Sequence, residues 1–391
     1  MDYNAAALEL HEKYHGKLTV NSLVPCKDKD ALATAYTPGV AEPCRRIAQN
    51  PDDVYRYTFK GRTVAVVTNG TAVLGLGNIG PEAGLPVMEG KCALFKEFGG
   101  VDAFPICLNA KTEAEVIAAV RAIAPTFGGI NLEDIRSPEC FAIEAALEKE
   151  LDIPVFHDDQ HGTAIIVLAG LLNALKVVGK RLADVRIVQN GPGAAGTAII
   201  RMLQTAGARH IIAVDEHGIL APGRPAGLDG HKARLAEETN EEKRTGTLAD
   251  ALRGADVFIG TSVAGALTPA MIAGMNPDAI VFAMANPKPE IMPDEARAAG
   301  VRVIGTGRSD FPNQVNNVLA FPGIFKGALS VRARDINDAM KMAAARAIAG
   351  LIADGELGEE NILPKAFDPR VPLAVAEAVA QAARESGVAR L

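Results

Sequence analysis

The strongest constraint on the fold is a regular alternation of short apolar segments and helical patterns between residues 185 and 304. Short buried strands are expected at residues 185–189, 210–214, 257–260, 280–283 and 301–304. Helical patterns, such as the one over residues 194–206, separate them. Strands that alternate with helices pair in parallel through right-handed crossovers. The pattern therefore predicts an α/β fold with a doubly wound parallel sheet in the C-terminal part of the chain.

A glycine-rich turn follows the first of these strands directly and opens the helix over residues 194–206. The turn consists of Asn190, Gly191, Pro192, Gly193, Ala194, Ala195 and Gly196. Backbone N–H groups at the start of a helix bind phosphate, so a turn in this position indicates a Rossmann-type dinucleotide site. A glycine turn without a ligand is the alternative, because such a short motif also occurs without this function.

The strand after this turn ends at Asp215, nineteen positions beyond Gly196. An acidic residue there accepts hydrogen bonds from the ribose hydroxyls of NAD and repels the 2′-phosphate of NADP. Glu216 adds a second negative charge, and no Lys or Arg follows within the next few positions. NAD is therefore the favoured cofactor, with NADP as the alternative.

The N-terminal part of the chain alternates in the same way over shorter segments. Strands are expected there at residues 63–68, 130–132 and 153–156. The first sixty residues are rich in turn signals, and residues 333–391 are mostly helical and expected to pack across both parts. We predict two domains that meet near residue 160. An α/β domain covers residues 1–160, and the dinucleotide-binding domain with the C-terminal helices covers residues 161–391.

Two acidic pairs follow short apolar strands of the N-terminal part. They are Glu133-Asp134 and Asp158-Asp159. Four carboxylates close together repel one another unless a cation neutralises them, and oxygen ligands without cysteine suit Mg²⁺ or Mn²⁺. Helix caps and solvated loop acids are an equally good interpretation of the spacing alone.

Three further features of the N-terminal part are open to two interpretations each. The glycine cluster with Gly75 and Gly77 is either a loop that approaches an anionic substrate or a structural turn. Lys91 has apolar neighbours along the chain. Either they lower its pKa so that it can serve as a base, or its side chain extends past them so that the ammonium group reaches solvent. Tyr36 lies in a rigid turn, where it either has a functional role or, as the simpler interpretation, only packs against its neighbours.

Composition excludes several classes of protein. The chain has 40 Lys and Arg against 47 Asp and Glu, so its net charge of −7 argues against nucleic-acid binding. No apolar stretch is expected to be long enough to span a membrane, and no secretory leader is recognisable at the start. Five scattered cysteines without metal-type spacing fit a reduced compartment. A cytoplasmic enzyme is therefore expected.

Eight segments, in this order along the chain, resemble the malic enzyme family in its short prokaryotic form. They are YTPGVA (36–41), VLGLGNIGP (73–81), MEGKCALF (88–95), NLEDI (131–135), FHDDQHGT (156–163), NGPGAAG (190–196), ANPKP (285–289) and NQVNNV (313–318). The resemblance implies oxidative decarboxylation of L-malate to pyruvate and CO₂, with NAD(P)⁺ and a divalent cation. It also implies a homodimer.

The resemblance assigns catalytic roles to three residues. It implies that Tyr36 is the general acid and Lys91 the general base, and that Asp158 holds the lysine in place. Because Asp158 and Asp159 are adjacent, their side chains are expected to point apart in extended backbone, so that one faces Lys91 and the other the metal.

The resemblance also assigns binding roles. It implies that the metal ligands are Glu133, Asp134 and Asp159. Asn286 and Asn317 match asparagines that line the malate and nicotinamide pocket.

The chain departs from the family at a few positions. Ala72 stands where larger malic enzymes have an arginine that holds a substrate carboxylate, and Asn69 and Asn78 stand where short forms often have Asp. Two other functions compete with the malic enzyme hypothesis. One is an NAD-linked hydroxy-acid or amino-acid dehydrogenase without decarboxylation, which would not need the metal-directed acids. The other is a dinucleotide sensor, which would not need Lys91 or Tyr36.

Overall fold

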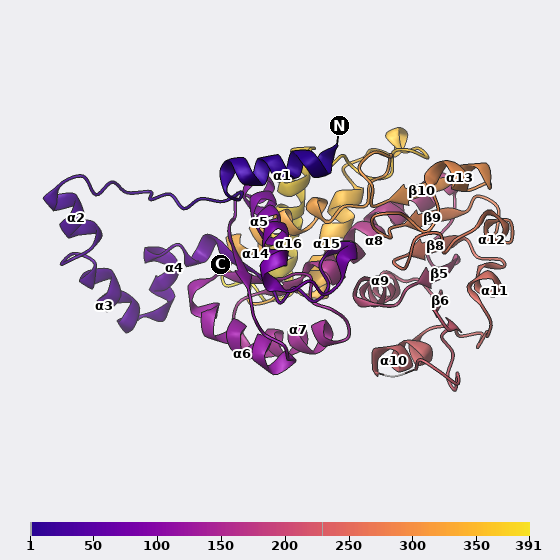
Figure 1. Cartoon of the computed structure of the whole chain (residues 1–391), viewed down its shortest axis with the longest axis horizontal. Coiled ribbons are helices and arrows are strands. Elements are labelled where there is room, and N and C mark those ends of the chain that lie inside the picture. The colour runs from indigo at the N-terminus through magenta and orange to yellow at the C-terminus, as the bar shows by residue number, and fades with distance from the viewer. Residues whose placement is uncertain (1, 229) are drawn as a thin grey trace.

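The computed structural model describes residues 2–228 and 230–391 and contains two β-sheets surrounded by helices (Figure 1). The N-terminal sheet is entirely parallel, with the strand order β2-β1-β3-β4. Its strands are β1 (Thr63–Thr68), β2 (Asp102–Cys107), β3 (Gly129–Leu132) and β4 (Val155–His157). The longer helices around this sheet are α5 (Pro81–Leu94), α6 (Glu113–Ile123) and α7 (Glu139–Glu150).

The sequence predicted β1, β3 and β4 but missed β2. Every residue of the central strand β1 is buried, which is why its β-branched residues give a clear signal. β2 pairs only with β1, so it lies at the edge of the sheet, and its residues are half-buried. It also contains Pro105, which is tolerated in an edge strand but weakens a strand prediction.

The second sheet has six strands in the order β10-β9-β8-β5-β6-β7, and only the pair β6–β7 is antiparallel. Its strands are β5 (Arg186–Asn190), β6 (His210–Asp215), β7 (Gly218–Ile219), β8 (Val257–Gly260), β9 (Ile280–Ala283) and β10 (Val303–Thr306). The helices between them are α9 (Ala194–Thr205), α10 (Gly230–Glu238), α11 (Leu248–Leu252), α12 (Pro269–Ile272) and α13 (Pro293–Ala298). The predicted doubly wound α/β sheet is confirmed.

A long apolar helix, α8 (Asp158–Val178), joins the two sheets. It packs against α9 on one side and against the C-terminal helix α15 (Asp338–Ala349) on another. By length and composition it could span a membrane, so the prediction that no apolar stretch is long enough was wrong. However, 67% of its most apolar window is buried inside the protein, as in the core helix of a globular domain.

The C-terminal helices return to the N-terminal sheet. Helices α14 (Phe321–Ser330) and α16 (Arg370–Glu385) pack against each other, and α14 contacts the segment that follows α5. The ring of Phe95 lies 4.7 Å from that of Phe321 and 5.3 Å from that of Phe325. One large apolar core therefore includes side chains from the N-terminal sheet and from the C-terminal helices. The boundary near residue 160 stays a prediction.

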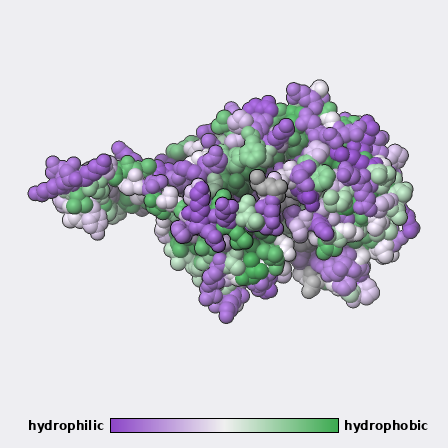
Figure 2. Space-filling view, turned by 45° about the horizontal axis from the view of Figure 1, so that its top comes forward, coloured by the Kyte–Doolittle hydropathy of each residue, from purple (hydrophilic) through white to green (hydrophobic). Residues whose placement is uncertain are grey.

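The first sixty residues contain four helices joined by turns and irregular segments, whereas the sequence predicted mainly turns. They form α1 (Tyr3–Tyr14), α2 (Lys29–Ala35), α3 (Ala41–Gln49) and α4 (Val54–Tyr57). None of residues 2–59 is buried. Figure 1 shows α2 and α3 at the end of an extension that leaves the main body, and in Figure 2 this extension carries apolar as well as polar side chains. We call residues 18–57 the arm.

Candidate active site

Lys91 lies in the last turn of α5, with its ammonium group between two carboxylates. Its Nζ is 2.6 Å from Asp158 Oδ2 and 2.9 Å from Glu133 Oε1. The ring of Phe321, at the start of α14, covers the ammonium group at 4.3 Å from the ring centroid. All three charged side chains are nearly inaccessible to solvent. A C-terminal helix thus covers a lysine that the N-terminal domain supplies.

The structure contradicts the lowered pKa that the apolar sequence neighbours of Lys91 predicted. Burial does act to lower the pKa, but the facing carboxylates of Asp158 and Glu133 outweigh it and raise the pKa above its ordinary value. The neighbours of Lys91 along the chain are apolar, whereas its neighbours across the fold are acidic. Its nitrogen can release a proton near neutral pH only if the negative charge around it is reduced.

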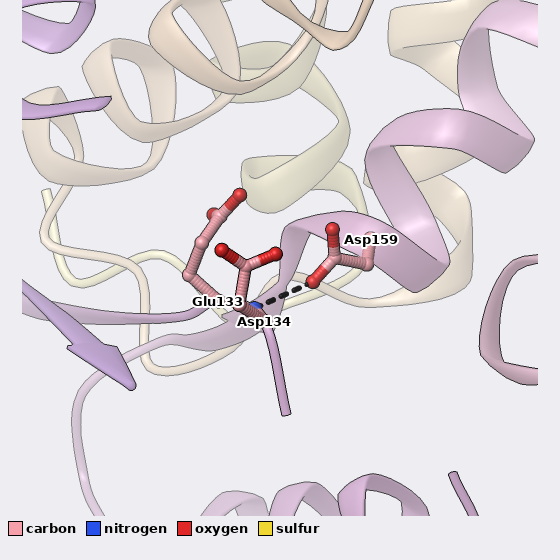
Figure 3. Close-up of side chains that lie close together, drawn as sticks. All are labelled: Glu133, Asp134 and Asp159. Carbon is pink, nitrogen blue, oxygen red and sulfur yellow. Dashed lines mark hydrogen bonds between the residues drawn. The ribbon is translucent and has the colours of Figure 1, made fainter. Parts of the chain in front are cut away.

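Three carboxylates beside Lys91 could hold a metal ion (Figure 3). Glu133 and Asp134 follow β3, and Asp159 is the second residue of α8. One oxygen of each lies within 4.8 Å of the others. The backbone N–H of Asp134 donates to Asp159 Oδ2 at 2.8 Å, the dashed line in Figure 3. Asp134 Oδ2 is buried and has no hydrogen-bond partner within residues 2–228 and 230–391.

The electrostatics of this trio favour a bound cation. Burial raises the pKa of Glu133 well above its ordinary value, although Lys91 opposes the shift. Burial, with the charge of Asp159 adding to it, raises the pKa of Asp134 to about 7. A divalent cation bound to these oxygens would favour the ionised form of both carboxylates. Oxygen ligands suit Mg²⁺ or Mn²⁺. The predicted clustering of the three acids is confirmed, while the ion itself stays a prediction.

The adjacent acids Asp158 and Asp159 face different partners, as predicted. Asp158 reaches Lys91, and Asp159 reaches the backbone of Asp134. The expected reason was wrong, because both residues lie in the first turn of α8 and not in extended backbone. Gly162, one turn later, leaves room for Asp158: a Cβ at this position would lie 2.0 Å from Asp158 Oδ1.

The predicted dinucleotide turn lies between β5 and α9. Gly191 has φ of 90°, and a Cβ there would lie 2.5 Å from the carbonyl oxygen of Thr261. At Gly196 a Cβ would lie 2.1 Å from the carbonyl oxygen of Gly191, so the helix can approach the turn this closely only with glycine. At Gly193 the space is open within 4 Å, which leaves the backbone accessible to a ligand.

Asp215 ends β6 beside this turn, but its carboxylate is not free. Arg224 donates to both of its oxygens, at 2.7 and 2.9 Å, and Lys232 donates to Oδ2 at 2.9 Å. The sequence analysis found no basic residue in the next few positions. The two cations come from farther along the chain, so the charge of Asp215 alone does not describe this end of the sheet.

Sequence profiles of one family match most of the chain. The malic enzyme N-terminal domain matches residues 15–117, and the malic enzyme NAD binding domain matches residues 160–384. The chain belongs to the malic enzyme family. The bifunctional malic/malolactic enzyme of Bacillus subtilis (strain 168) is 57% identical over 391 residues, which cover 100% of this chain and 95% of that protein. The NAD-dependent malic enzyme of Geobacillus stearothermophilus is 56% identical over 375 residues, which cover 96% and 78%.

Other members of the malic enzyme family extend the comparison. The NADP-dependent malic enzyme of Halomonas elongata is 48% identical over 403 residues, which cover 98% of this chain and 94% of that protein. The crystal structure of malic enzyme from Pyrococcus horikoshii Ot3 superimposes with a TM-score of 0.92 at 51% identity, covering 98% of this chain and 92% of that one. Relatives named for NAD and for NADP are thus both similar to this chain.

Tyr36, the expected general acid of a malic enzyme, does not lie with Lys91. It follows α2 on the arm, and 68% of its surface is exposed. Among the described residues no hydrogen bond or ion pair connects its side chain to the cluster around Lys91. Figure 1 shows α2 far from α5, which carries Lys91. The structure therefore separates two residues that the resemblance placed in one site.

The two asparagines of the expected malic enzyme pocket contact different parts of the fold. Asn317 donates to Asp158 Oδ2 at 3.0 Å and accepts from Thr163 at 3.2 Å. Asn286, after β9, contacts the glycine cluster, because a Cβ on Gly75 would lie 2.9 Å from its carbonyl oxygen. Gly77 has φ of 74° and open space around it. The glycine cluster therefore meets the C-terminal domain and is more than an isolated turn.

Glu144, which was not predicted from the sequence, organises the segment that carries both aspartates. Its carboxylate accepts from the backbone N–H of His157 at 2.8 Å and from Gln160 at 2.9 Å, and it lies 3.0 Å from His161 Nε2. Burial opposes ionisation of Glu144, but His161 outweighs it and lowers the pKa to about 2. The one hint in the sequence is that Glu144 falls on the buried face of α7, where an acidic residue needs a polar partner.

Proposed function

We propose that this chain catalyses the oxidative decarboxylation of L-malate to pyruvate and CO₂, with reduction of NAD(P)⁺. The observation that carries the proposal is the position of Lys91 between Asp158 and Glu133, beside the three clustered carboxylates. A hydroxy-acid oxidation needs a base, and the following loss of CO₂ needs a cation at the C2 oxygen. A dehydrogenase without decarboxylation would need only the base.

Lys91 is the proposed general base, and Asp158 positions it. Lys91 accepts the proton of the C2 hydroxyl at Nζ while the hydride leaves for the nicotinamide. Asp158, 2.6 Å away and held by Asn317, fixes the direction of the amine. When Glu133 shares its charge with a cation, one of the two carboxylates that hold the proton on Lys91 is weakened, so the neutral amine becomes accessible.

Glu133, Asp134 and Asp159 would hold the metal. The free buried oxygen of Asp134 and the 4.8 Å limit between ligand atoms fit an oxygen-liganded divalent ion. When bound, Mg²⁺ or Mn²⁺ would supply a positive charge that stabilises the enolate oxygen at C2 formed when CO₂ is lost. The same site is expected to decarboxylate added oxaloacetate, because loss of CO₂ from oxaloacetate is the second step of the proposed reaction.

Tyr36 is proposed to act in the site of a second copy of the chain. In its own chain it is exposed on the arm, where side chains such as Leu32, Val20 and Leu23 are also exposed. Exposed apolar side chains on an extension without a buried residue indicate a surface that another protein covers. A homodimer in which each arm reaches the partner would bring Tyr36 to the place where C3 of enolpyruvate is protonated.

The remaining candidates are proposed to hold the substrate and the cofactor. Asn286, Asn317 and the turns at Gly75 and Gly77 would line the pocket for malate and the nicotinamide ring. The turn from Gly191 through Pro192, Gly193, Ala194 and Ala195 to Gly196 would hold the pyrophosphate. The expected preference for NAD⁺ depends on Asp215 and stays a prediction. A cytoplasmic location is also expected.

The test is a coupled measurement of NAD(P)H and CO₂ from L-malate, with Mn²⁺ and after chelation with EDTA. We expect both products in equal amounts with the metal and neither without it. NAD(P)H without CO₂, or a rate that survives chelation, would contradict the proposal. A comparison of kcat/KM for NAD⁺ and NADP⁺ in the same assay measures the cofactor preference, and a clear NADP⁺ preference would remove the role assigned to Asp215.

A further inference from the structure

Glu290, in the loop between β9 and α13, is a fully buried acidic residue to which the proposed reaction assigns no role. Its exposed fraction is 0%. The hydrogen bonds that its carboxylate accepts come from neutral groups of the chain. Burying a carboxylate is costly unless hydrogen bonds replace its hydration, so these donors explain why an acid is tolerated here. What the donors belong to therefore indicates what Glu290 does.

The two oxygens of Glu290 bind two different loops. Oε1 accepts from the backbone N–H of Ser262 at 2.8 Å and from the Ser262 hydroxyl at 3.1 Å. Oε2 accepts from the backbone N–H of Ala285 at 3.0 Å. Gly260, the last residue of β8, leaves room for the carboxylate, because a Cβ there would lie 2.5 Å from Oε1. One side chain thus joins the loops that follow the neighbouring parallel strands β8 and β9.

The loop after β8 holds the start of the dinucleotide turn. Ser262 Oγ accepts from Asn190 Nδ2 at 2.8 Å. A hydroxyl has one hydrogen, which Ser262 gives to Glu290, while its lone pair serves Asn190. The Thr261 hydroxyl donates to the carbonyl of Gly191 at 2.7 Å. Oε1 of Glu290 therefore acts, through Ser262, on the turn that would hold the pyrophosphate.

The loop after β9 holds Asn286, one of the residues proposed to line the pocket for malate and nicotinamide. Ala285 is buried, whereas Asn286 is exposed. The carbonyl oxygen of Asn286 lies 2.9 Å from the place of a Cβ on Gly75, and its side-chain amide lies 3.6 Å from the place of a Cβ on Gly307, after β10. The hydrogen bond to Ala285 fixes the backbone directly before this exposed residue. Oε2 of Glu290 therefore acts, through Ala285, on the pocket beside the glycine cluster.

We propose that Glu290 is a positioning residue whose carboxylate holds Asn286 and the dinucleotide turn in one fixed arrangement, so that malate and the nicotinamide meet in the reactive geometry. The proposal rests on the proposed function and adds a residue that contacts neither ligand. Hydride transfer depends on this arrangement, since a misplacement of about 1 Å costs about 10²-fold in rate.

Glu290→Gln separates the two halves of this role. Glutamine keeps the shape of the side chain but has one acceptor oxygen and an NH₂ group that donates. With its oxygen towards Ser262 it retains two of the three hydrogen bonds, and its NH₂ group then faces the N–H of Ala285. Two donors repel each other, so the loop with Asn286 must move while the dinucleotide turn keeps its anchor.

Two measurements on the full chain test the proposal. Steady-state kinetics with L-malate, NAD⁺ and Mn²⁺ should show that Glu290→Gln lowers kcat/KM for malate about tenfold, because a buried N–H loses its acceptor. Isothermal titration with ADP-ribose, which lacks the nicotinamide, should give an affinity unchanged within about twofold. That unchanged affinity also shows that the variant is folded.

Glu295→Gln is the matched control. Glu295 lies on α13, and it is exposed. The same change of charge and shape there should alter neither kcat/KM for malate nor the affinity for ADP-ribose.

An unchanged kcat/KM for malate in Glu290→Gln would overturn the proposal. A parallel loss of kcat/KM and of ADP-ribose binding would also overturn it, because that pattern shows a general structural role. Both results require a wild-type protein that oxidises malate. Wild-type protein without this activity would instead contradict the proposed function, so the two failures are distinguishable.

Discussion

The cluster around Lys91 and the cluster around Asp215 have opposite charge balances. At the first, four carboxylates gather around one lysine. At the second, one carboxylate faces an arginine and a lysine. Both lie at or just beyond the C-terminal ends of parallel strands, where an open α/β sheet binds ligands. The difference teaches how burial acts on the two clusters: the surplus charge of the first is negative, which a bound cation would neutralise, whereas the acid of the second is already paired with cations of the chain itself.

The comparison also shows why buried clusters are more informative than net charge. A surplus charge in a buried cluster is poorly screened, so it either shifts the pKa values of its members or is neutralised by a ligand. Burial raises the pKa values of Glu133 and Asp134 near Lys91, whereas the pKa of Asp215 is lowered. The formal net charge of −7 would have predicted repulsion of any anion.

The largest effect is expected when the lysine of the first cluster is replaced. Lys91→Ala should lower kcat for malate by about 10³-fold, because a general base contributes about 10²- to 10⁴-fold. Lys91→Arg keeps the positive charge between the two carboxylates but cannot give up a proton near neutral pH, so it should lose as much. Steady-state kinetics with Mn²⁺ measures both.

The affinity for NAD(P)⁺ should change by less than about twofold in either Lys91 variant, which also checks the fold. Lys96→Ala, at an exposed lysine five positions along the chain, is the matched control and should retain activity. Near-wild-type turnover of Lys91→Ala would remove the assignment of the base.

A smaller effect is expected from displacing the partner of Lys91. Gly162→Ala places a Cβ 2.0 Å from the present position of Asp158 Oδ1, so the carboxylate must move. A shift of about 1 Å at a reacting group costs about 10²-fold, and we expect kcat to fall by this amount with little change in the KM for NAD(P)⁺. At Gly355, where nothing lies within 4 Å, the same substitution should have no effect. An active Gly162→Ala variant would show that the contact between Asp158 and Lys91 is not required.

The smallest effect concerns stability at the second cluster. Burial opposes ionisation of Asp215, but hydrogen bonds from Arg224 and Lys232 outweigh it and lower its pKa to about 2. A lowered pKa stabilises the fold above the unfolded-state value of 3.8, and this stability is lost as the pH falls through the folded-state value. After allowance for screening we expect about 1 kcal/mol.

Urea unfolding of wild type and of Asp215→Asn measures this contribution. The wild-type advantage should be constant between pH 5 and 7 and should shrink as the pH falls from about 4 towards about 2. If the difference in the free energy of unfolding between wild type and Asp215→Asn grew as the pH fell, the stabilising role of the ion pairs of Asp215 would be contradicted.

The sequence predicted the elements that short apolar segments and the residues at their ends define. The parallel strands of the second sheet, the turn from Gly191 to Gly196 and the meeting of Glu133, Asp134 and Asp159 were foreseen, whereas the two-residue strand β7 was not. Each depends on a strand that ends in a polar or glycine residue, and parallel strands bring such ends together. The half-buried edge strand β2 and the unburied helices α1 to α4 were missed because neither has the hydrophobic periodicity that burial produces.

Contacts between distant segments could not be predicted in this way. Arg224 and Lys232 reach Asp215 only because the chain turns back through β7 and α10. The pKa of Lys91 was predicted in the wrong direction because its partners Glu133 and Asp158 follow strands far along the chain. Electrostatic environments depend on the tertiary fold, so sequence neighbours alone misjudge them.

The arm has a genetic consequence if it supplies Tyr36 to a partner. Tyr36→Phe and Lys91→Ala chains would each form inactive dimers, because every site would lack one of the two groups. A mixed dimer would combine the intact Lys91 of one chain with the intact Tyr36 of the other in one of its two sites. Random exchange of equal amounts would restore about one quarter of the sites. Two defective alleles could thus complement each other in one cell.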